Sequence, residues 1–183
     1  MAESERYRWL AAELAEKGMD VEAIKADLKA QWIETPSWGY GDSGTRFAVF
    51  AQPGAARNPF EKIADAAQVH KYTGVAPSVA LHIPWDKLSD YAELNAYAAS
   101  LGLKLGAINP NTFQDEIYRL GSVTNADPAV RKQAVAHMLE CVEIGKTVGS
   151  SLLSVWLADG TSSPGQDSIR ARMHRLVDSL AQV

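Results

Sequence analysis

Residues 78–85, with the sequence SVALHIPW, decide the fold class. Apolar residues occupy both faces of this predicted strand around His82, which is typical of a strand covered by helices on both sides. Upstream, Asn58-Pro59-Phe60-Glu61 carries the signals of a helix start: an Asn cap, Pro at the first helical position and Glu three residues after the cap. We expect this helix to run to about Thr73, with Gly74 ending it.

The same alternation of strand and helix continues on both sides of this stretch. Further strands are expected at 36–39, 103–109 and 151–157, and further helices after Asp90, after Asp127-Pro128 and after Asp167 or Ser168. Strand–helix units in a row, about 25 to 45 residues apart, predict an α/β fold with a parallel sheet and right-handed crossovers.

The first 34 residues differ from the rest because they contain helix signals and no strand signals. Ser4 and Asp20 are candidate N-caps of two amphipathic helices, and Gly18 is placed to end the first. We therefore divide the chain into a helical arm, 1–34, and a body of four strand–helix units, 35–183. Since a (β/α)8 TIM barrel takes about 250 residues, the body is either a small open sheet or half of a barrel.

Composition excludes several classes of protein. The 183 residues are 46% hydrophobic and 22% charged, with a net charge of −4, which argues against disorder and against nucleic-acid binding. No apolar run approaches the roughly 18 residues of a membrane span, and the start MAESERYRWL lacks a signal-peptide core. The single Cys141 rules out a disulfide framework and fits the cytoplasm.

Candidate site residues follow the predicted strands, because sites in parallel α/β folds form at the carboxyl ends of strands. Three tryptophans lie at such positions, and indole rings beside amide and imidazole groups suit the C–H faces and hydroxyls of a sugar. The candidates are Trp38, Asp42, Arg46, Phe47, His82, Trp85, Asp86, Asn109, Asn111, Phe113, Trp156, Asp159 and Gly160.

Structural roles are open for the same residues. A tryptophan at a strand end also suits a core, His82 also suits a buried structural histidine, and Asp42 and Asp86 also suit caps of turns. GYGDSG, residues 39–44, lacks the spacing of a phosphate-binding loop. His137 and Glu140 share the spacing of a carboxylate-bundle metal motif, without partners on neighbouring helices.

Five longer stretches resemble a known family. In this order and spacing, they are similar to bacterial L-rhamnose isomerases of the broad-specificity type, which are xylose-isomerase-like TIM barrels. The stretches are TPSWGYGDSGTRFAVF (35–50), LHIPWD (81–86), INPNTF (108–113), AVAHMLECVEIGKTVGS (134–150) and SVWLADGTSSPGQ (154–166). Family members are more than twice as long, so the resemblance implies that this chain holds the arm and the first four β/α units.

The resemblance implies an aldose–ketose isomerase that converts L-rhamnose to L-rhamnulose with divalent metal, usually Mn²⁺. His82 would then hydrogen-bond the sugar near its ring oxygen or C1, Trp38 and Trp156 would wall the pocket, and Trp85 and Asp86 would support His82. Phe47 would enter the pocket of a neighbouring subunit, since the family is usually tetrameric.

The family's metal ligands and proton-transfer residues lie on strands five to eight, in motifs that this chain does not contain. The resemblance therefore assigns no catalytic residue and no metal ligand to this chain, which alone is expected to be inactive. The last predicted helix reaches Val183 without a Gly, Pro or polar tail, which favours a fragment of an isomerase. The alternative is a non-catalytic half-barrel module for sugar binding or assembly.

Overall fold

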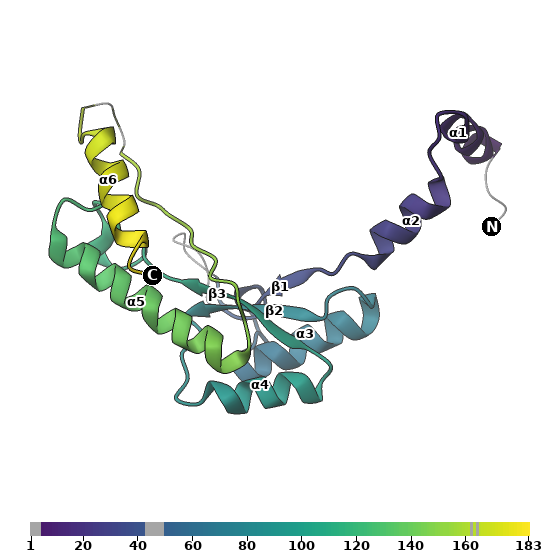
Figure 1. Ribbon diagram of the computed structural model, residues 1–183. Helices are drawn as coiled ribbons and strands as arrows, with labels where there is room; N and C mark the ends of the chain where they lie inside the picture. The colour runs from purple at the N-terminus through teal and green to yellow at the C-terminus, as the bar shows by residue number, and fades with distance from the viewer. Residues whose placement is uncertain (1–4, 43–49, 162, 164) are drawn as a thin grey trace.

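The computed structural model describes residues 5–42, 50–161, 163 and 165–183. The chain begins with two helices, α1 (Glu5–Glu16) and α2 (Val21–Ala30), which have no buried residues and lead away from the sheet (Figure 1). The predicted cap Asp20 accepts hydrogen bonds from the amides of Glu22 and Ala23 and so fixes the start of α2. No helix among the described residues is long and apolar enough to cross a membrane.

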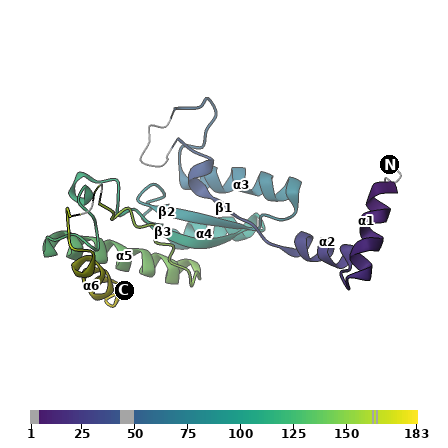
Figure 2. The same cartoon turned by 90° about the horizontal axis from the view of Figure 1, so that it is seen from above.

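A parallel sheet forms the centre of the body, as predicted. Its strands β1 (Glu34–Pro36), β2 (Ser78–Ile83) and β3 (Lys104–Pro110) pair in the order β1-β2-β3. From above, the strands lie side by side, and the arm leaves on the side opposite α5 and α6 (Figure 2).

Helices follow the strands in the predicted alternation. They are α3 (Pro59–Thr73), α4 (Tyr91–Ser100), α5 (Pro128–Val148) and α6 (Ile169–Leu180). Each begins where a predicted cap accepts a backbone amide hydrogen bond within the first turn, at Asn58, Asp90, Asp127 and Ser168. Gly74 ends α3 with φ of 71°, in the left-handed region that favours glycine.

The bounds of the first two predicted strands differ from the structure. The first was expected at 36–39, but β1 ends at Pro36 and Ser37–Gly39 form the 3₁₀ helix η1. The chain turns there because the Ser37 hydroxyl is buried and donates to the carboxylate of Asp86. β2 also stops earlier than expected, at Ile83, because Pro84 has no amide hydrogen to continue the ladder.

The fourth strand, expected at 151–157, is a single parallel bridge between Ile108 and Leu153. The amide of Ile108 donates to Leu152 O (3.0 Å), and the amide of Ser154 donates to Ile108 O (2.9 Å). In the described part of the chain no further strand pairs with the other side of this segment, so the ladder ends after one bridge. The prediction of a fourth strand is wrong, although the segment lies where it would run.

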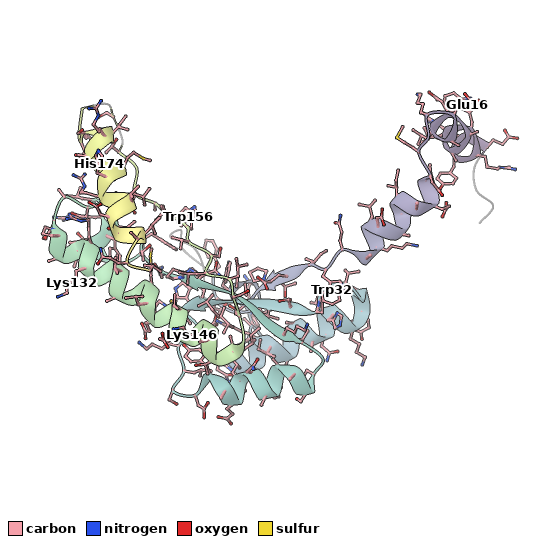
Figure 3. All side chains as sticks on the ribbon, viewed as in Figure 1. Glu16, Trp32, Lys132, Lys146, Trp156 and His174 are labelled. Carbon is pink, nitrogen blue, oxygen red and sulfur yellow. The ribbon has the colours of Figure 1, made fainter. Side chains whose placement is uncertain are left out.

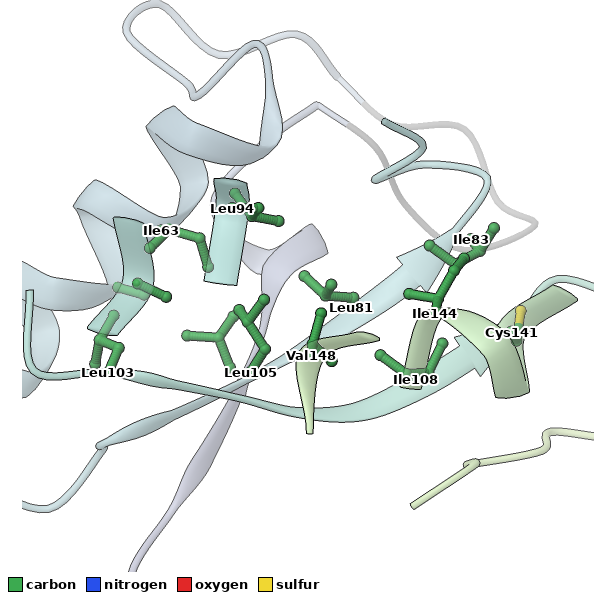
Figure 4. Close-up of a cluster of buried hydrophobic side chains, with 13 residues drawn as sticks. Ile63, Leu81, Ile83, Leu94, Leu103, Leu105, Ile108, Cys141, Ile144 and Val148 are labelled. Carbon is green, nitrogen blue, oxygen red and sulfur yellow. The ribbon is translucent and has the colours of Figure 1, made fainter. Parts of the chain in front are cut away.

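The alternation of side chains along β2 separates the core from the opposite face of the sheet. Val79, Leu81 and Ile83 point into an apolar cluster with residues from α3, α4, β3 and α5 (Figure 4). Since successive side chains point to opposite faces of a strand, Ala80 and His82 lie on the other face. That face carries the candidate site.

Candidate functional site

A cavity of about 170 Å³ lies at the carboxyl ends of the strands. Aromatic residues from four separate segments form most of its wall, and Trp156 lies on the side of the sheet away from α3 and α4 (Figure 3). The prediction that the side chains of Trp38, His82, Trp85 and Trp156 converge on one cavity is confirmed. The full lining is Trp38, His82, Trp85, Asn109, Pro110, Phe113, Ser154 and Trp156.

The imidazole of His82 is the centre of the aromatic wall. Its ring stacks on Trp85 with centroids 3.7 Å apart and planes at 16°, and it meets Trp38 edge-on at 5.3 Å. Phe113 lies at 6.0 Å from His82 and contacts Trp156 edge-on at 4.6 Å. A continuous series of ring contacts therefore joins the exit of β1 to the 151–157 segment.

Burial sets the charge of His82. The residue is only 5% exposed, and this burial lowers the pKa of His82 from 6.5 to about 4, against the opposing influence of the Asp86 carboxylate. His82 is therefore neutral near pH 7. Its Nδ1 is buried without a hydrogen-bond partner in the described structure. A lone pair at that position is less unfavourable than an unpaired N–H, which favours the tautomer with the proton on Nε2.

A β-bulge brings Asn109 to the cavity. The register pairs Val79 with Leu105 but Leu81 with Ile108, so β3 contains one extra residue in this interval. Without it, His82 would lie opposite Ile108; with it, His82 lies opposite Asn109. The bulge therefore places an amide beside the imidazole and keeps Ile108 in the core.

The carboxylate of Glu34, on β1, satisfies the amide that this bulge leaves unpaired. Its two oxygens lie 3.1 and 3.2 Å from the amide nitrogen of Ala107, and the Ser78 hydroxyl donates to it at 2.6 Å. A Cβ at Gly106 would lie 1.4 Å from Glu34 Oε2, so only glycine fits under this side chain. Glu34 thus joins all three strands at the point where the register changes.

Asp86 lies behind the cavity and not in its wall. Its Oδ1 lies 2.7 Å from Lys62 Nζ, and its Oδ2 accepts from the amide of His82 (2.8 Å) and from the Ser37 hydroxyl. Two roles were expected for Asp86, a cap of a turn from its position and support of His82 from the family resemblance; the amide of His82 donates directly to its carboxylate. Sequence reasoning missed Lys62, because a lysine in the charged helix EKIADAAQVHKY has the pattern of a solvated residue.

The loop after β3 closes one side of the site. Trp85 Nε1 donates to Gln114 Oε1 at 3.0 Å, and Asn111 Nδ2 donates to the same oxygen at 2.9 Å. Asn111 Oδ1 in turn accepts from the amides of Phe113 and Gln114. Asn111 therefore orders the loop, while Phe113 supplies the wall.

Other candidates lie outside the cavity. Asp42 accepts from the amide of Gln52 (2.9 Å), and Asp159 binds the 122–124 segment. His137 Nε2 lies 3.1 Å from Ile83 O, with its Nδ1 3.1 Å from Glu140. Gly160 lines a separate polar hollow beside Arg172. Arg46 and Phe47 lie outside the described residues.

The arrangement of the described His, Cys, Asp and Glu side chains shows whether they could hold a metal ion. Among them, no group of three or more His, Cys, Asp or Glu residues is arranged to hold an ion. In the cavity His82 is the only such residue in the lining, and the neighbouring carboxylate of Asp86 is already bound by Lys62, Ser37 and the His82 amide. These residues do not fit a Mn²⁺ site.

Comparison with known proteins gives the chain's relationships. No protein-family model matches it. It is 45% identical over 182 residues to a probable sugar isomerase of Rhizobium meliloti and 42% identical to one of Mesorhizobium japonicum; each alignment covers 97% of this chain and 42% of the relative. A xylose isomerase of Thermus thermophilus is 34% identical over 55 residues, which is 30% of this chain and 14% of that protein.

A solved structure shares the fold. D-psicose 3-epimerase from Clostridium cellulolyticum H10, crystallised with D-tagatose, superposes with a TM-score of 0.54 and 14% identity, covering 80% of this chain and 45% of the epimerase. The α/β fold class of TIM-barrel type is thereby confirmed. The chain spans less than half the length of the curated relatives it matches. Over nearly its whole length, it is a homologue of probable sugar isomerases.

Proposed function

We propose that this chain supplies the sugar-binding wall of an aldose–ketose isomerase that converts L-rhamnose to L-rhamnulose. The observation that carries the proposal is the convergence of Trp38, His82, Trp85 and Trp156 on one cavity at the carboxyl ends of the strands. Apolar ring faces pack on the C–H faces of a sugar, while a few polar groups fix its orientation. The homology to probable sugar isomerases supports the reaction class.

In this proposal His82 acts as a neutral hydrogen-bond donor. Its low pKa keeps the ring uncharged near pH 7. Its Nδ1 is buried without a hydrogen-bond partner in the described structure, which favours a proton on Nε2. Such a group donates to a sugar oxygen near the ring oxygen or C1. Trp38 and Trp156 contact the sugar's apolar faces, Trp85 fixes the imidazole plane by stacking, and Asn109 offers a second polar group.

The isomerisation moves hydrogen between C1 and C2 of the opened sugar, and a divalent ion such as Mn²⁺ supplies Lewis-acid polarisation of the oxygens there when it is bound. Since the described side chains do not fit such an ion, we assign the metal ligands and the proton-transfer groups to residues outside this chain. This chain then contributes binding and orientation of the sugar, and no catalytic residue.

A second candidate is a non-catalytic module that binds sugar or assembles with another chain. One observation favours it: Trp38, His82, Trp85 and Trp156 converge on one cavity, and ring contacts of this kind bind sugar without taking part in turnover. The two candidates differ in turnover and not in sugar affinity.

We also propose a quaternary structure and a cellular compartment. Phe47 is proposed to enter the cavity of a neighbouring subunit in a tetramer, which light scattering on wild-type protein and Phe47→Ala would test. A reducing cytoplasm is proposed because Cys141 is a free, buried thiol whose pKa burial raises to about 12.

The decisive experiment is calorimetric titration of the purified chain with L-rhamnose, followed by an assay for L-rhamnulose with Mn²⁺ present. We expect binding that weakens about tenfold in Trp38→Ala and Trp156→Ala, the loss of about one good contact. Trp9→Ala, in the exposed arm, is the matched control and should bind as wild type. Binding unaffected by the two cavity variants would overturn the proposed site. Turnover by this chain with Mn²⁺ would show that the catalytic residues are misplaced.

A further inference from the structure

An ion pair between Lys62 and Asp86 lies directly behind the aromatic wall. The two charged atoms are 2.7 Å apart, and the side chains are 4% and 0% exposed. Lysine is almost never buried to this extent unless it is paired, and α3 carries it from the helical layer to the exits of β1 and β2. Neither residue lines the cavity.

Three rings of the wall, Trp38, His82 and Trp85, are adjacent to a group that this pair binds. Asp86 Oδ2 accepts from the hydroxyl of Ser37, the residue before Trp38, and from the amide of His82 itself. Lys62 Nζ also lies 3.5 Å from the carbonyl oxygen of Trp85. The carboxylate of Asp86 therefore bonds Ser37, which lies next to Trp38 after β1, and the backbone of His82, which lies on β2.

We propose that Lys62 is a positioning residue for the sugar site, which acts through Asp86 to hold His82 and Trp85 in their stacked arrangement and Trp38 edge-on to them. The statement about sugar rests on the proposed function; the statement about the rings does not. A buried carboxylate without a counter-ion is strongly unfavourable and either takes up a proton or turns toward water. Lys62 removes that penalty, so that Oδ2 stays free to bind Ser37 and His82.

A contribution to stability alone is the competing explanation, and a double variant separates the two. Replacing both members of a buried ion pair by apolar residues of similar size is often neutral for stability. Lys62→Met/Asp86→Leu should therefore fold, yet it has no acceptor for Ser37 Oγ or the His82 amide. The matched control is Lys146→Met/Glu143→Leu, which removes an exposed pair on α5.

Two measurements compare each variant with wild type. Indole ¹⁵N–¹H NMR signals, assigned by single Trp→Phe changes, report the surroundings of Trp38 and Trp85, and the Trp85 signal is marked by its hydrogen bond to Gln114. Calorimetry with L-rhamnose reports sugar affinity. In the double variant we expect both indole signals to shift or broaden and the affinity to fall about tenfold, the effect of losing about one hydrogen bond. The control should match wild type in both.

Native indole signals and native affinity in a folded double variant would overturn the proposal, because the pair would then serve stability only. Ser37→Ala gives a test that keeps the ion pair: the Trp38 signal should move and the Trp85 signal should not. An unchanged Trp38 signal there also overturns it. If wild-type protein does not bind L-rhamnose, the proposed function fails, while the indole signals still decide whether the Lys62–Asp86 pair positions the rings.

Discussion

Two apolar stretches, residues 78–85 and 151–157, lead into different structures, although a buried aspartate follows each of them. The first contains β2, paired on both sides by β1 and β3. The second forms one bridge to Ile108, and its Leu152 is 59% exposed. β2 has a hydrogen-bonded neighbour on each side, whereas among the described residues the second stretch has only the bridge to Ile108, so an apolar sequence alone does not make a strand.

At the site, a buried aspartate after each stretch binds groups from other segments of the chain and so fixes the position of that stretch. Asp86 anchors the turn after β2 through Lys62, Ser37 and the His82 amide. Asp159 accepts from the amides and hydroxyls of both Ser122 and Thr124, at 2.8–2.9 Å. Trp156 is thereby held near the cavity even though its segment is not a strand. The difference between the anchors is that only Asp86 neutralises a buried cation.

The largest expected effect comes from removing the first anchor. Asp86→Ala leaves Lys62 buried without its anion and should lower the free energy of unfolding by about 3–5 kcal/mol. Asp159→Ala removes hydrogen bonds from uncharged donors and leaves no buried cation unpaired, so it should lower it by about 2 kcal/mol. Urea unfolding of the two variants measures both values. Equal losses would mean that the charge of Lys62 does not distinguish the two regions.

The apolar side chains give a second comparison of the same stretches. Leu81 is fully buried in β2, so Leu81→Ala should lower the free energy of unfolding by about 3 kcal/mol through lost burial and the cavity that remains. Leu152→Ala, on the exposed segment, should change it by no more than about 0.5 kcal/mol. If another chain covers that segment in solution, Leu152→Ala will be costly as well, and the effect will depend on protein concentration.

Local signals explain what could be predicted from the sequence. The caps at Asn58, Asp90 and Asp127 bind amides two or three residues away, so their residue types alone located three helix starts. Strand-end chemistry likewise located Trp38, His82, Trp85 and Trp156, because the carboxyl ends of parallel strands share one edge.

Contacts between distant residues explain what could not be predicted. β1 ends early because Ser37 binds a carboxylate 49 residues away. The bulge in β3 depends on Glu34, which is 73 residues from the amide of Ala107. Lys62 is buried because of Asp86, 24 residues further on. No local pattern contains these pairs.

The low pKa of His82 predicts a pH dependence of stability. The unfolded state takes up the proton near the ordinary pKa of 6.5, whereas the folded state does so at about 4. Between these values the unfolded state binds more protons, so stability falls as the pH is lowered, by about 3 kcal/mol at pH 4 relative to pH 7. Unfolding of wild type and of His82→Gln across this range isolates the contribution. Parallel curves would mean that His82 takes up its proton at the same pH in the folded and the unfolded state.

A further prediction, with a smaller effect than Asp86→Ala or Leu81→Ala, concerns the β-bulge in β3. This bulge lies between the pairs Val79–Leu105 and Leu81–Ile108 and shifts the register of β3 by one residue. Gly106→Ala places a Cβ where the Glu34 carboxylate lies, so the carboxylate has to leave the amide of Ala107. A buried amide left unpaired costs about 1–3 kcal/mol. Because Glu34→Ala breaks the same contact, the double variant should lose no more than the larger single loss, and the two effects should not add. Hydrogen exchange at Ala107, measured beside urea unfolding, should be faster in all three variants. Additive losses with unchanged exchange would show that Glu34 does not hold the bulge, and that Asn109 faces the cavity for another reason.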